Sequence, residues 1–260
     1  MIDNASADNS KQMVRTQFPQ VRLLENELNV GFARANNRAI HECAGRLVML
    51  LNSDTIVEAN ALCRMIEFMA AHPLAGIAGA NLVNSDGSPQ WCWGSFPTVV
   101  SETAVIWGLN CRWPFAGWLT PQFKDAASDQ SVDWVLGASL MVRRSVIDQI
   151  GDLDDSFFMY SEDIDFAYRA RQGRWPVYLV RDARIVHLGG RSSIQMPAAM
   201  KAELLRSKVK FFRKHRASWL AFVLHVIFSV SIICKRWIYL AQGKRVVSDL
   251  WRQTWGYYTG

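Results

Sequence analysis

The sequence has few cysteines, and none of them form a recognisable pair. Five cysteines are scattered through 260 residues, at positions 43, 63, 92, 111 and 234, and no two make a Cys-x-x-Cys motif. This odd, dispersed set argues against a disulfide framework and against a zinc knuckle, and it favours a reducing compartment. The N-terminus also lacks an apolar stretch behind a basic start, so no signal peptide is predicted.

Charge is sparse and unbalanced in sign. Charged residues make up 20% of the chain and hydrophobic residues 50%, a composition that excludes disorder as the default and allows a substantial core. The 29 Lys and Arg residues exceed the 23 Asp and Glu residues by six. This excess indicates an anionic partner, with nucleic acid, nucleotide phosphates and acidic lipid as the candidates.

The first half of the chain alternates between strand-like and helix-like segments. Residues 32–43 have helical spacing with Gly45 just past their end, and residues 60–72 form a second helical segment for which Asn60 is the expected cap. Short apolar runs predict strands at residues 20–24, 46–51 and 77–80. Strands that alternate with helices predict an α/β sheet with crossover connections.

This pattern breaks at residues 84–89, which have the composition of a turn. The next 40 or so residues are irregular and rich in tryptophan, with Trp91, Trp93, Trp107, Trp113 and Trp118. Aromatic faces stack on sugars, so this stretch is predicted either to form a lid or acceptor platform or simply to pack in the core. Regular structure is expected again at residues 132–142, 177–180 and 184–187.

The C-terminal part contains a long uncharged stretch. Residues 217–234 carry no charge and lie between two groups of basic residues, with Trp219 near one end and Trp237 near the other. Aromatic and basic residues in such positions favour a membrane interface. Eighteen residues is the short end of a membrane span, so a span, a helix lying in the interface and a buried core helix all stay open. We predict a globular domain over residues 1–205 and a membrane-associating helical tail over residues 206–260.

Three polar motifs follow predicted strands or open predicted helices. In the first, Asn52-Ser53-Asp54 comes directly after the apolar run at residues 46–51. Ligands bind beyond the carboxyl ends of strands in open α/β sheets, and an aspartate there can hold a divalent ion that bridges to phosphate. The alternative is an ordinary turn, since Asn and Asp are common turn residues.

The second motif, Glu162-Asp163-Ile164-Asp165, follows an aromatic run. Ser161 can cap a helix whose first turn carries the three acids, and the helix dipole favours carboxylates there. A well-capped surface helix is therefore one interpretation. The other is a general base, because crowded and buried carboxylates raise one another's pKa.

In the third motif, His187 closes a predicted strand and two glycines follow it. This arrangement can place an imidazole and backbone amides near a phosphate, and Arg191 can supply a bidentate guanidinium. A single histidine is more often structural, and that alternative also stays open.

Taken in order, these segments resemble family-2 glycosyltransferases, and most of all the rhamnosyltransferase-like branch. The resemblance covers about residues 1–195 and depends on the ordered combination, not on any single motif. It is carried by Asp3-Asn4-Ala5-Ser6, Asn29-Val30-Gly31-Phe32-Ala33, Leu51-Asn52-Ser53-Asp54-Thr55, Val135-Leu136-Gly137-Ala138, Phe157-Phe158-Met159-Tyr160 with the Glu162 motif, and His187.

The resemblance implies a GT-A fold, with a Rossmann-like, mostly parallel sheet and flanking helices. It implies an inverting transfer from a nucleotide-diphosphate sugar, with Mg²⁺ or Mn²⁺ on the diphosphate. Asp163 would be the general base and Glu162 would support it. Asp54 and His187 would ligate the metal.

The remaining donor contacts are also carried over by position. Asp3 would contact the nucleobase, and Asn52 would help through its amide oxygen or reach the ribose. Gly137 and Ala138 would line the donor sugar, and Arg191 would bind phosphate.

The front of the chain departs from the family pattern. Family members have a strand and a nucleotide-contacting loop before the Asp3 segment, whereas here only Met1 and Ile2 precede it. The expected sheet therefore lacks its usual first strand, and residues 46–51 lack a neighbour. Either the true start lies upstream or the chain is a truncated product.

The implied acceptor is a polyprenyl-diphosphate-linked sugar or a glycan, at the cytoplasmic face of the plasma or inner membrane. The chain would associate with the membrane peripherally or through one span, in cell-wall or O-antigen polysaccharide synthesis. Nucleic acid is not the predicted partner, because the basic residues cluster around the apolar tail and not along a folded face. Two alternatives are an inactive membrane-associated scaffold and a sugar-1-phosphate nucleotidyltransferase. The second would need a Gly-rich N-terminal loop with Arg or Lys, which the sequence does not contain.

Overall fold

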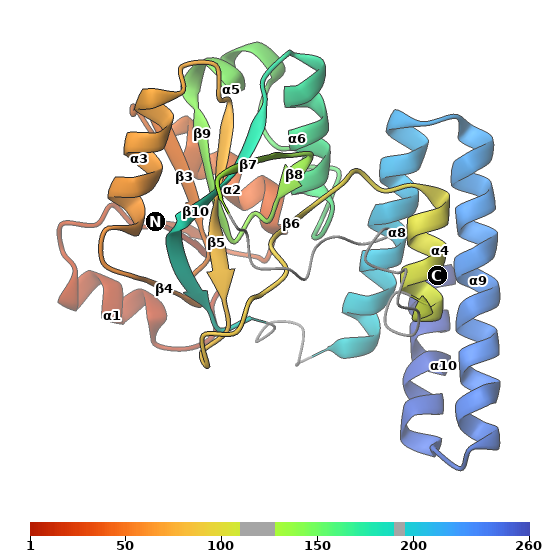
Figure 1. Ribbon diagram of the computed structural model, residues 1–260. Coiled ribbons are helices and arrows are strands. Elements are labelled where there is room, and N and C mark those ends of the chain that lie inside the picture. The colour runs from red at the N-terminus through yellow and green to blue at the C-terminus, as the bar shows by residue number, and fades with distance from the viewer. Residues whose placement is uncertain (110–127, 190–195) are drawn as a thin grey trace.

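A computed structural model describes residues 1–109, 128–189 and 196–260. Figure 1 shows two parts side by side: an α/β region built around a twisted sheet, and a group of long helices that ends the chain. The structure confirms the predicted α/β fold class. The proposed boundary between residues 205 and 206 stays a prediction.

The main sheet has six strands in the described residues. Five follow the order β3-β9-β5-β10-β4. The sixth strand, β7, lies off this path and pairs with β10. β3, β5 and β10 run in one direction, and β4, β7 and β9 run in the other. The strands are β3 (Leu47–Leu51), β4 (Thr55–Val57), β5 (Ile77–Val83), β7 (Gln130–Val132), β9 (Ser139–Arg143) and β10 (Val177–His187).

The sequences of the two neighbouring strands β5 and β10 explain why these segments form strands. All seven residues of β5 are buried, as expected of an apolar run with helices on both faces of the sheet. β10 joins the two segments that were predicted separately at residues 177–180 and 184–187. Its register against β5 shifts between Val180 and Arg184, so the polar residues in between are accommodated without ending the strand.

A second, two-stranded sheet lies at the N-terminus. β1 (Ile2–Asn4) and β2 (Leu24–Asn26) pair in parallel, and α1 (Ser10–Gln17) connects them. β2 begins at the end of the strand predicted at residues 20–24. Within the described chain, β3 hydrogen-bonds only to β9. Its alternate residues Leu47, Met49 and Leu51 share one face of the sheet and line a groove together with Met141 of β9 and with side chains of the following helix.

Helices cover the main sheet and bury their apolar sides against it. They are α2 (Phe32–His41), α3 (Ala61–Ala71), α5 (Arg144–Ile150) and α6 (Glu162–Gln172). Met65, Phe68 and Met69 of α3 are buried at the spacing expected of an amphipathic helix. The capping role predicted for Asn60 is wrong: this residue precedes α3 but has a left-handed backbone (φ 68°), and no side-chain capping bond is found for it in the described structure.

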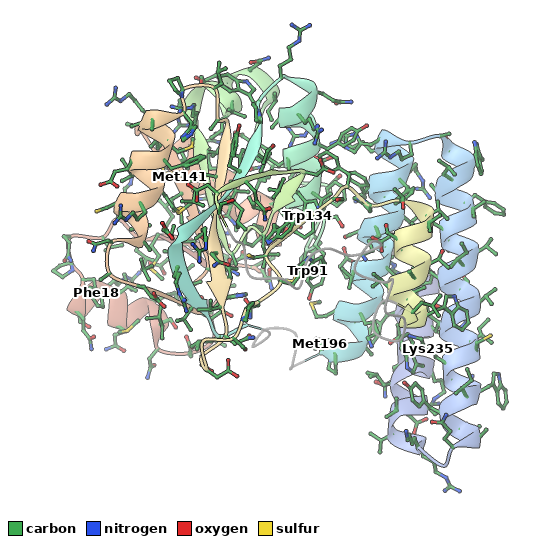
Figure 2. All side chains as sticks on the ribbon, viewed as in Figure 1. Phe18, Trp91, Trp134, Met141, Met196 and Lys235 are labelled. Atoms are coloured by element: carbon green, nitrogen blue, oxygen red, sulfur yellow. The ribbon has the colours of Figure 1, made fainter. Side chains whose placement is uncertain are left out.

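A short two-stranded pairing occupies part of the tryptophan-rich stretch. β6 (Trp93–Gly94) pairs with β8 (Trp134–Val135), and Trp91 packs edge-on against Trp134 with ring centroids 5.3 Å apart (Figure 2). Trp134 is buried, whereas Trp91 is 40% exposed. The predicted roles of Trp113 and Trp118 fall outside the described residues.

The C-terminal helices form their own hydrophobic cluster. α8 (Pro197–His215), α9 (Ser218–Ala241) and α10 (Arg245–Thr259) pack together, and α4 (Val99–Trp107) joins them. Phe157, from the loop before α6, is buried in this cluster, which connects it to the α/β region. In the described part of the chain, α9 is the one helix long and apolar enough to cross a membrane, with a mean hydropathy of 1.8 over its best window.

Candidate active site

Strand pairing brings together Asp54 and His187, which are far apart in the sequence. Asp54 lies in the turn between β3 and β4, and His187 is the last residue of β10. Because β10 runs antiparallel to β4 with His187 opposite Thr55, the two side chains meet, with His187 Nε2 3.3 Å from Asp54 Oδ1. The Leu188 N–H also donates to the Asp54 carbonyl oxygen (2.8 Å).

Gln90 holds the other side of the imidazole. His187 Nδ1 lies 2.6 Å from Gln90 Oε1, and Gln90 Nε2 donates to the His187 carbonyl oxygen (3.2 Å). A proton on Nδ1 that is donated to Gln90 leaves the Nε2 lone pair directed at Asp54, which is the state in which a histidine binds a metal. Sequence reasoning missed Gln90, because a glutamine after a turn belongs to no motif.

The Asp54 and His187 pair fits a metal that is shared with a substrate. Within the described ranges, no group of three or more His, Cys, Asp and Glu side chains gathers that could hold an ion. Mg²⁺ and similar ions are commonly held by one or two protein ligands together with substrate phosphates. One carboxylate oxygen and one imidazole nitrogen are therefore a suitable partial donor set.

The turn that carries Asp54 is joined to the loop before β9. The Asn52 N–H donates to the Ala138 carbonyl oxygen (3.0 Å), and Thr55 Oγ1 donates to the Asn52 carbonyl oxygen (2.7 Å). The neighbouring Gly137 N–H donates to Asp163 Oδ2 (3.0 Å). One short loop thus connects the Asp54 turn to the carboxylate at the start of α6.

Asp163 is buried and held at both oxygens. Oδ2 accepts from Gly137, and Oδ1 accepts from the Ile164 N–H (2.8 Å). Burial raises the pKa of Asp163, although the hydrogen bonds from Gly137 and Ile164 lower it in part. A Cβ atom at Gly137 would lie 3.3 Å from the Phe32 ring and 3.8 Å from Asp163 Cβ, so little room for a side chain exists beside this carboxylate.

Glu162 is buried next to Asp163 but has a different environment. Its Oε2 has no hydrogen-bond partner among the described residues. Burial raises the pKa of Glu162 well above its usual range, and the charges of Asp163 and Glu203 raise it further. Two adjacent buried carboxylates do not both ionise readily, so Glu162 is the one expected to stay neutral.

The backbone before α6 is strained. Tyr160 and Ser161 are consecutive non-glycine residues in the left-handed region, with φ of 70° and 65°. The predicted capping by Ser161 is wrong: the residue has the N-cap position, but within the described structure its side chain makes no capping hydrogen bond. This left-handed turn is what points Glu162 and Asp163 inward.

The third acid of the motif, Asp165, belongs to a separate network. It is fully buried, and its oxygens lie 2.8 Å from Arg169 Nε, 2.7 Å from Lys214 Nζ and 2.7 Å from His215 Nε2. Lys214 and His215 end α8, so Asp165 connects α6 to the C-terminal helices. The three acids are therefore not one cluster.

Asp3 lies in β1, in the N-terminal sheet. It is buried, and its Oδ2 accepts from the Ser6 N–H (3.1 Å). The structure places Ser6 at the edge of a hollow that Lys11 and Asn26 also line. Arg191 falls outside the described residues.

Gly31 connects the N-terminal part to the loop that precedes α6. The Phe32 N–H donates to the Phe158 carbonyl oxygen (2.8 Å). Gly31 has φ +86°, and a Cβ there would lie 2.4 Å from that same oxygen. Only glycine permits this close approach of the two backbones.

The α/β sheet thus carries an aspartate in the turn after β3, a histidine at the end of β10 and a buried carboxylate at the start of α6. The family model described as Glycosyl transferase family 2 matches residues 1–151. The chain belongs to this family, as the sequence predicted.

Two curated relatives have related names. The chain is 29% identical over 237 residues to an N-acetylglucosaminyl-diphospho-decaprenol L-rhamnosyltransferase of Mycobacterium tuberculosis, a match that covers 84% of this chain and 75% of the relative. It is 27% identical over 176 residues to the low-salt glycan biosynthesis hexosyltransferase Agl10 of Haloferax volcanii, covering 66% of this chain and 52% of that one.

Two solved structures share the fold. A mannosyltransferase from Pyrobaculum calidifontis in complex with GDP-Man and Mn²⁺ superposes with a TM-score of 0.55 at 15% identity, covering 99% of this chain and 74% of that one. GalNAc-T7 with UDP, GalNAc and Mn²⁺ also gives a TM-score of 0.55, at 13% identity, covering 82% of this chain. This chain spans 40% of the length of GalNAc-T7.

Proposed function

We propose that this chain transfers a sugar, rhamnose, from a dTDP- or UDP-type donor to a polyprenyl-diphosphate-linked or glycan acceptor in cell-envelope polysaccharide synthesis, with inversion at the anomeric carbon. The observation that carries the proposal is the buried Asp163, which the Gly137 loop joins to the Asp54 turn. The name of the M. tuberculosis relative supports the sugar and the lipid-linked acceptor.

The donor is held at the ends of β3 and β10. Asp54 and His187 bind Mg²⁺ or Mn²⁺, which when bound offsets the negative charge of the departing diphosphate. The two solved structures that contain Mn²⁺ support a divalent ion. Gly137 and Ala138 border the sugar.

The other donor contacts are assigned from the family motifs. Asn52 reaches the ribose or the ion through its amide oxygen, Asp3 contacts the nucleobase, and Arg191 binds the phosphates. These roles follow from the positions of the residues in the family motifs.

Asp163 takes the proton of the acceptor hydroxyl as that oxygen attacks the anomeric carbon. A raised pKa makes the carboxylate a better proton acceptor, provided that it is ionised at the working pH. Glu162 supports this state by remaining neutral, because a second buried negative charge would favour protonation of Asp163. The Gly137 and Ile164 N–H groups orient the carboxylate.

Replacing Asp163 by Asn tests the assignment. The Asp163→Asn enzyme should lose transfer by about 10²–10⁴-fold or more, as expected when a general base is removed. Binding of the nucleotide diphosphate with Mn²⁺, measured by isothermal titration, should stay nearly unchanged. Asp155→Asn is the matched control, since Asp155 is an exposed carboxylate paired with Arg34. Unchanged turnover in the Asp163 variant removes it as the base.

The titration also separates an enzyme from an inactive scaffold. A transferase binds nucleotide diphosphate in a metal-dependent manner, whereas a scaffold shows no metal-dependent heat. The reaction is then followed with a polyprenyl-diphosphate acceptor at a membrane surface, the cytoplasmic face of the plasma or inner membrane being the proposed location.

A further inference from the structure

Helix α9 has two apolar faces, and among the described residues only one of these faces is covered by protein. Its inner face packs against α4, α8 and α10 and includes the fully buried Leu224, Phe228 and Ile232. Figure 1 shows α9 along the side of the helical group that faces away from the sheet. The outer face carries apolar residues at successive spacings of three or four, namely Trp219, Phe222, Val226, Val230, Ile233, Trp237 and Leu240.

This outer stripe is exposed along the whole helix. Trp219 is 65% exposed, Phe222 68% and Trp237 57%, and the four aliphatic members are 40–46% exposed. Residues at this spacing share one side of a helix, so the seven side chains form one continuous strip. A contiguous strip of seven exposed apolar side chains is uncommon on a protein that contacts only water, and it marks a binding surface.

The charges around the strip identify its partner. Residues 204–248 contain ten Lys and Arg residues and no Asp or Glu. Lys208 and Lys214 pair with acidic side chains within the protein, whereas Arg236, Lys244 and Arg245 lie at the C-terminal end of α9 or directly after it. Arg236 lies beside the Trp237 ring (5.4 Å), and Lys244 lies beside the Tyr239 ring (5.8 Å), at the end of α9. A strip with a tryptophan near each end, and with cations beside its C-terminal end, complements the interface of a bilayer that contains anionic lipids.

The packing of α9 decides how it meets the bilayer. A span would surround α9 with lipid and would remove its inner face from α8 and α10. On that inner side Lys235 Nζ lies 4.8 Å from the Trp251 ring, and Lys201 Nζ of α8 lies 4.3 Å from the same ring (Figure 2 labels Lys235). A span by α9 would take Lys235 toward hydrocarbon and would break its contact with Trp251, which is costly.

We propose that α9 lies in the plane of the membrane and docks on an anionic lipid surface through the strip from Trp219 to Leu240. The inference deepens the proposed function, on which it rests, because it places the catalytic domain beside the lipid phase that holds a polyprenyl-linked acceptor. A helix of this kind inserts its apolar face at the boundary between headgroups and acyl chains while its other face stays on the protein.

Vesicle flotation of the full chain tests the docking. The protein should float with vesicles of phosphatidylcholine and phosphatidylglycerol. The double substitution Phe222→Glu with Val230→Glu should lower the partition coefficient by at least about tenfold, because it introduces charge into the exposed strip that would contact the acyl chains. The matched control is Leu28→Glu with Leu74→Glu, two leucines on the α/β region that are 74% and 78% exposed, and it should float as the wild type does.

A second variant measures the electrostatic contribution to vesicle binding. Lys244→Glu with Arg245→Glu should weaken flotation with phosphatidylglycerol vesicles and leave the weaker binding to pure phosphatidylcholine vesicles unchanged. Equal flotation of the wild type and the Phe222 and Val230 variant overturns the proposal. So does size-exclusion chromatography in which that variant converts a dimer to a monomer and the wild type does not float, because the strip would then be an interface between two copies.

Depth measurements distinguish docking from spanning. Nitroxide labels on cysteines placed at positions 222, 230 and 237, in a chain whose native cysteines are replaced by serine, should report equal depths near the headgroups. A deep label at position 230 between two shallow labels would show a span and overturn the in-plane orientation. Transfer to a water-soluble, short-chain acceptor is measured in parallel. Failure of transfer with intact flotation refutes the proposed function alone, and lost flotation with intact transfer refutes the docking alone.

Discussion

Replacing Asp165 by Asn should destabilise the protein far more than its position outside the catalytic pair suggests. Asp165 is fully buried and is the shared partner of Arg169, Lys214 and His215. The Asn side chain keeps the shape but loses the negative charge, and its amide nitrogen must face a donor on one side or the other. One of the two acceptor oxygens is then lost, and the remaining amide oxygen carries no charge to offset the three neighbouring groups.

The size of the effect follows from the burial of this network. Removing one partner of a buried ion pair costs about 3–5 kcal/mol, because the remaining charges stay desolvated without compensation. For a chain of this length, 1 kcal/mol corresponds to about 2–4 °C in the unfolding midpoint, so a decrease of roughly 6–20 °C is expected. Asp249→Asn is the control: Asp249 pairs with Arg252 at the surface, where both side chains are more than half exposed. Such a pair contributes less than about 1 kcal/mol.

The assay is thermal unfolding followed by near-ultraviolet circular dichroism, together with denaturant midpoints at fixed pH and salt. The two variants make the same chemical change, so a larger decrease for Asp165→Asn isolates the effect of burial. Equal midpoints for the Asp165→Asn and Asp249→Asn proteins would refute the interpretation that this network fixes α8 to α6.

Three further predictions concern the site. Gly31→Ala should lower the free energy of unfolding by more than about 1–2 kcal/mol, because the new Cβ would collide with the Phe158 oxygen. Gly87 has a similar φ but lies in open space, so in denaturant titrations Gly87→Ala should show only the smaller cost of the backbone conformation. Glu162→Gln should raise the melting temperature by an amount that depends on pH. Because the pKa of Glu162 is raised in the folded protein, the wild type keeps its full stability below the usual Glu pKa and loses stability as pH rises through the pKa of the folded state. The gain should therefore vanish in acid and grow toward neutral pH, and a pH-independent gain would contradict this reasoning. Gln90→Leu should weaken Mn²⁺ binding, titrated in the presence of nucleotide diphosphate, by about 10–100-fold through loss of its hydrogen bond to His187, and unchanged affinity would remove Gln90 from the proposed site.

The elements of the sheet were largely predictable from the sequence, because buried strands and amphipathic helices leave strong local patterns. The apolar run at residues 46–51 became β3, and the helical spacing at residues 32–43 became α2, each with small differences at the ends. The two predicted helix caps were wrong for a common reason. Asn60 and Ser161 have left-handed backbones, and composition alone does not show that geometry.

Candidate site residues could be named from motifs in the sequence, but their arrangement in space could not be predicted. Asp54 and His187 were each identified from a motif, yet their 3.3 Å approach depends on the antiparallel register of β10 against β4, which is a long-range pairing. The separation of Asp163 from Asp165 is equally non-local, because it depends on cations that α8 supplies. Helix α9 has apolar residues on two faces, and its sequence alone does not indicate which of these faces packs against the rest of the protein.

The left-handed pair at Tyr160 and Ser161 has a consequence for protein engineering. Glycine adopts this backbone without strain, so a search for thermostable variants should select glycine at position 160 or 161. The same substitution would free the turn that aims Asp163, and a flexible turn holds a catalytic group less well. Heat resistance and turnover should therefore change in opposite directions at these two positions, and a screen for stability alone would discard the better catalyst.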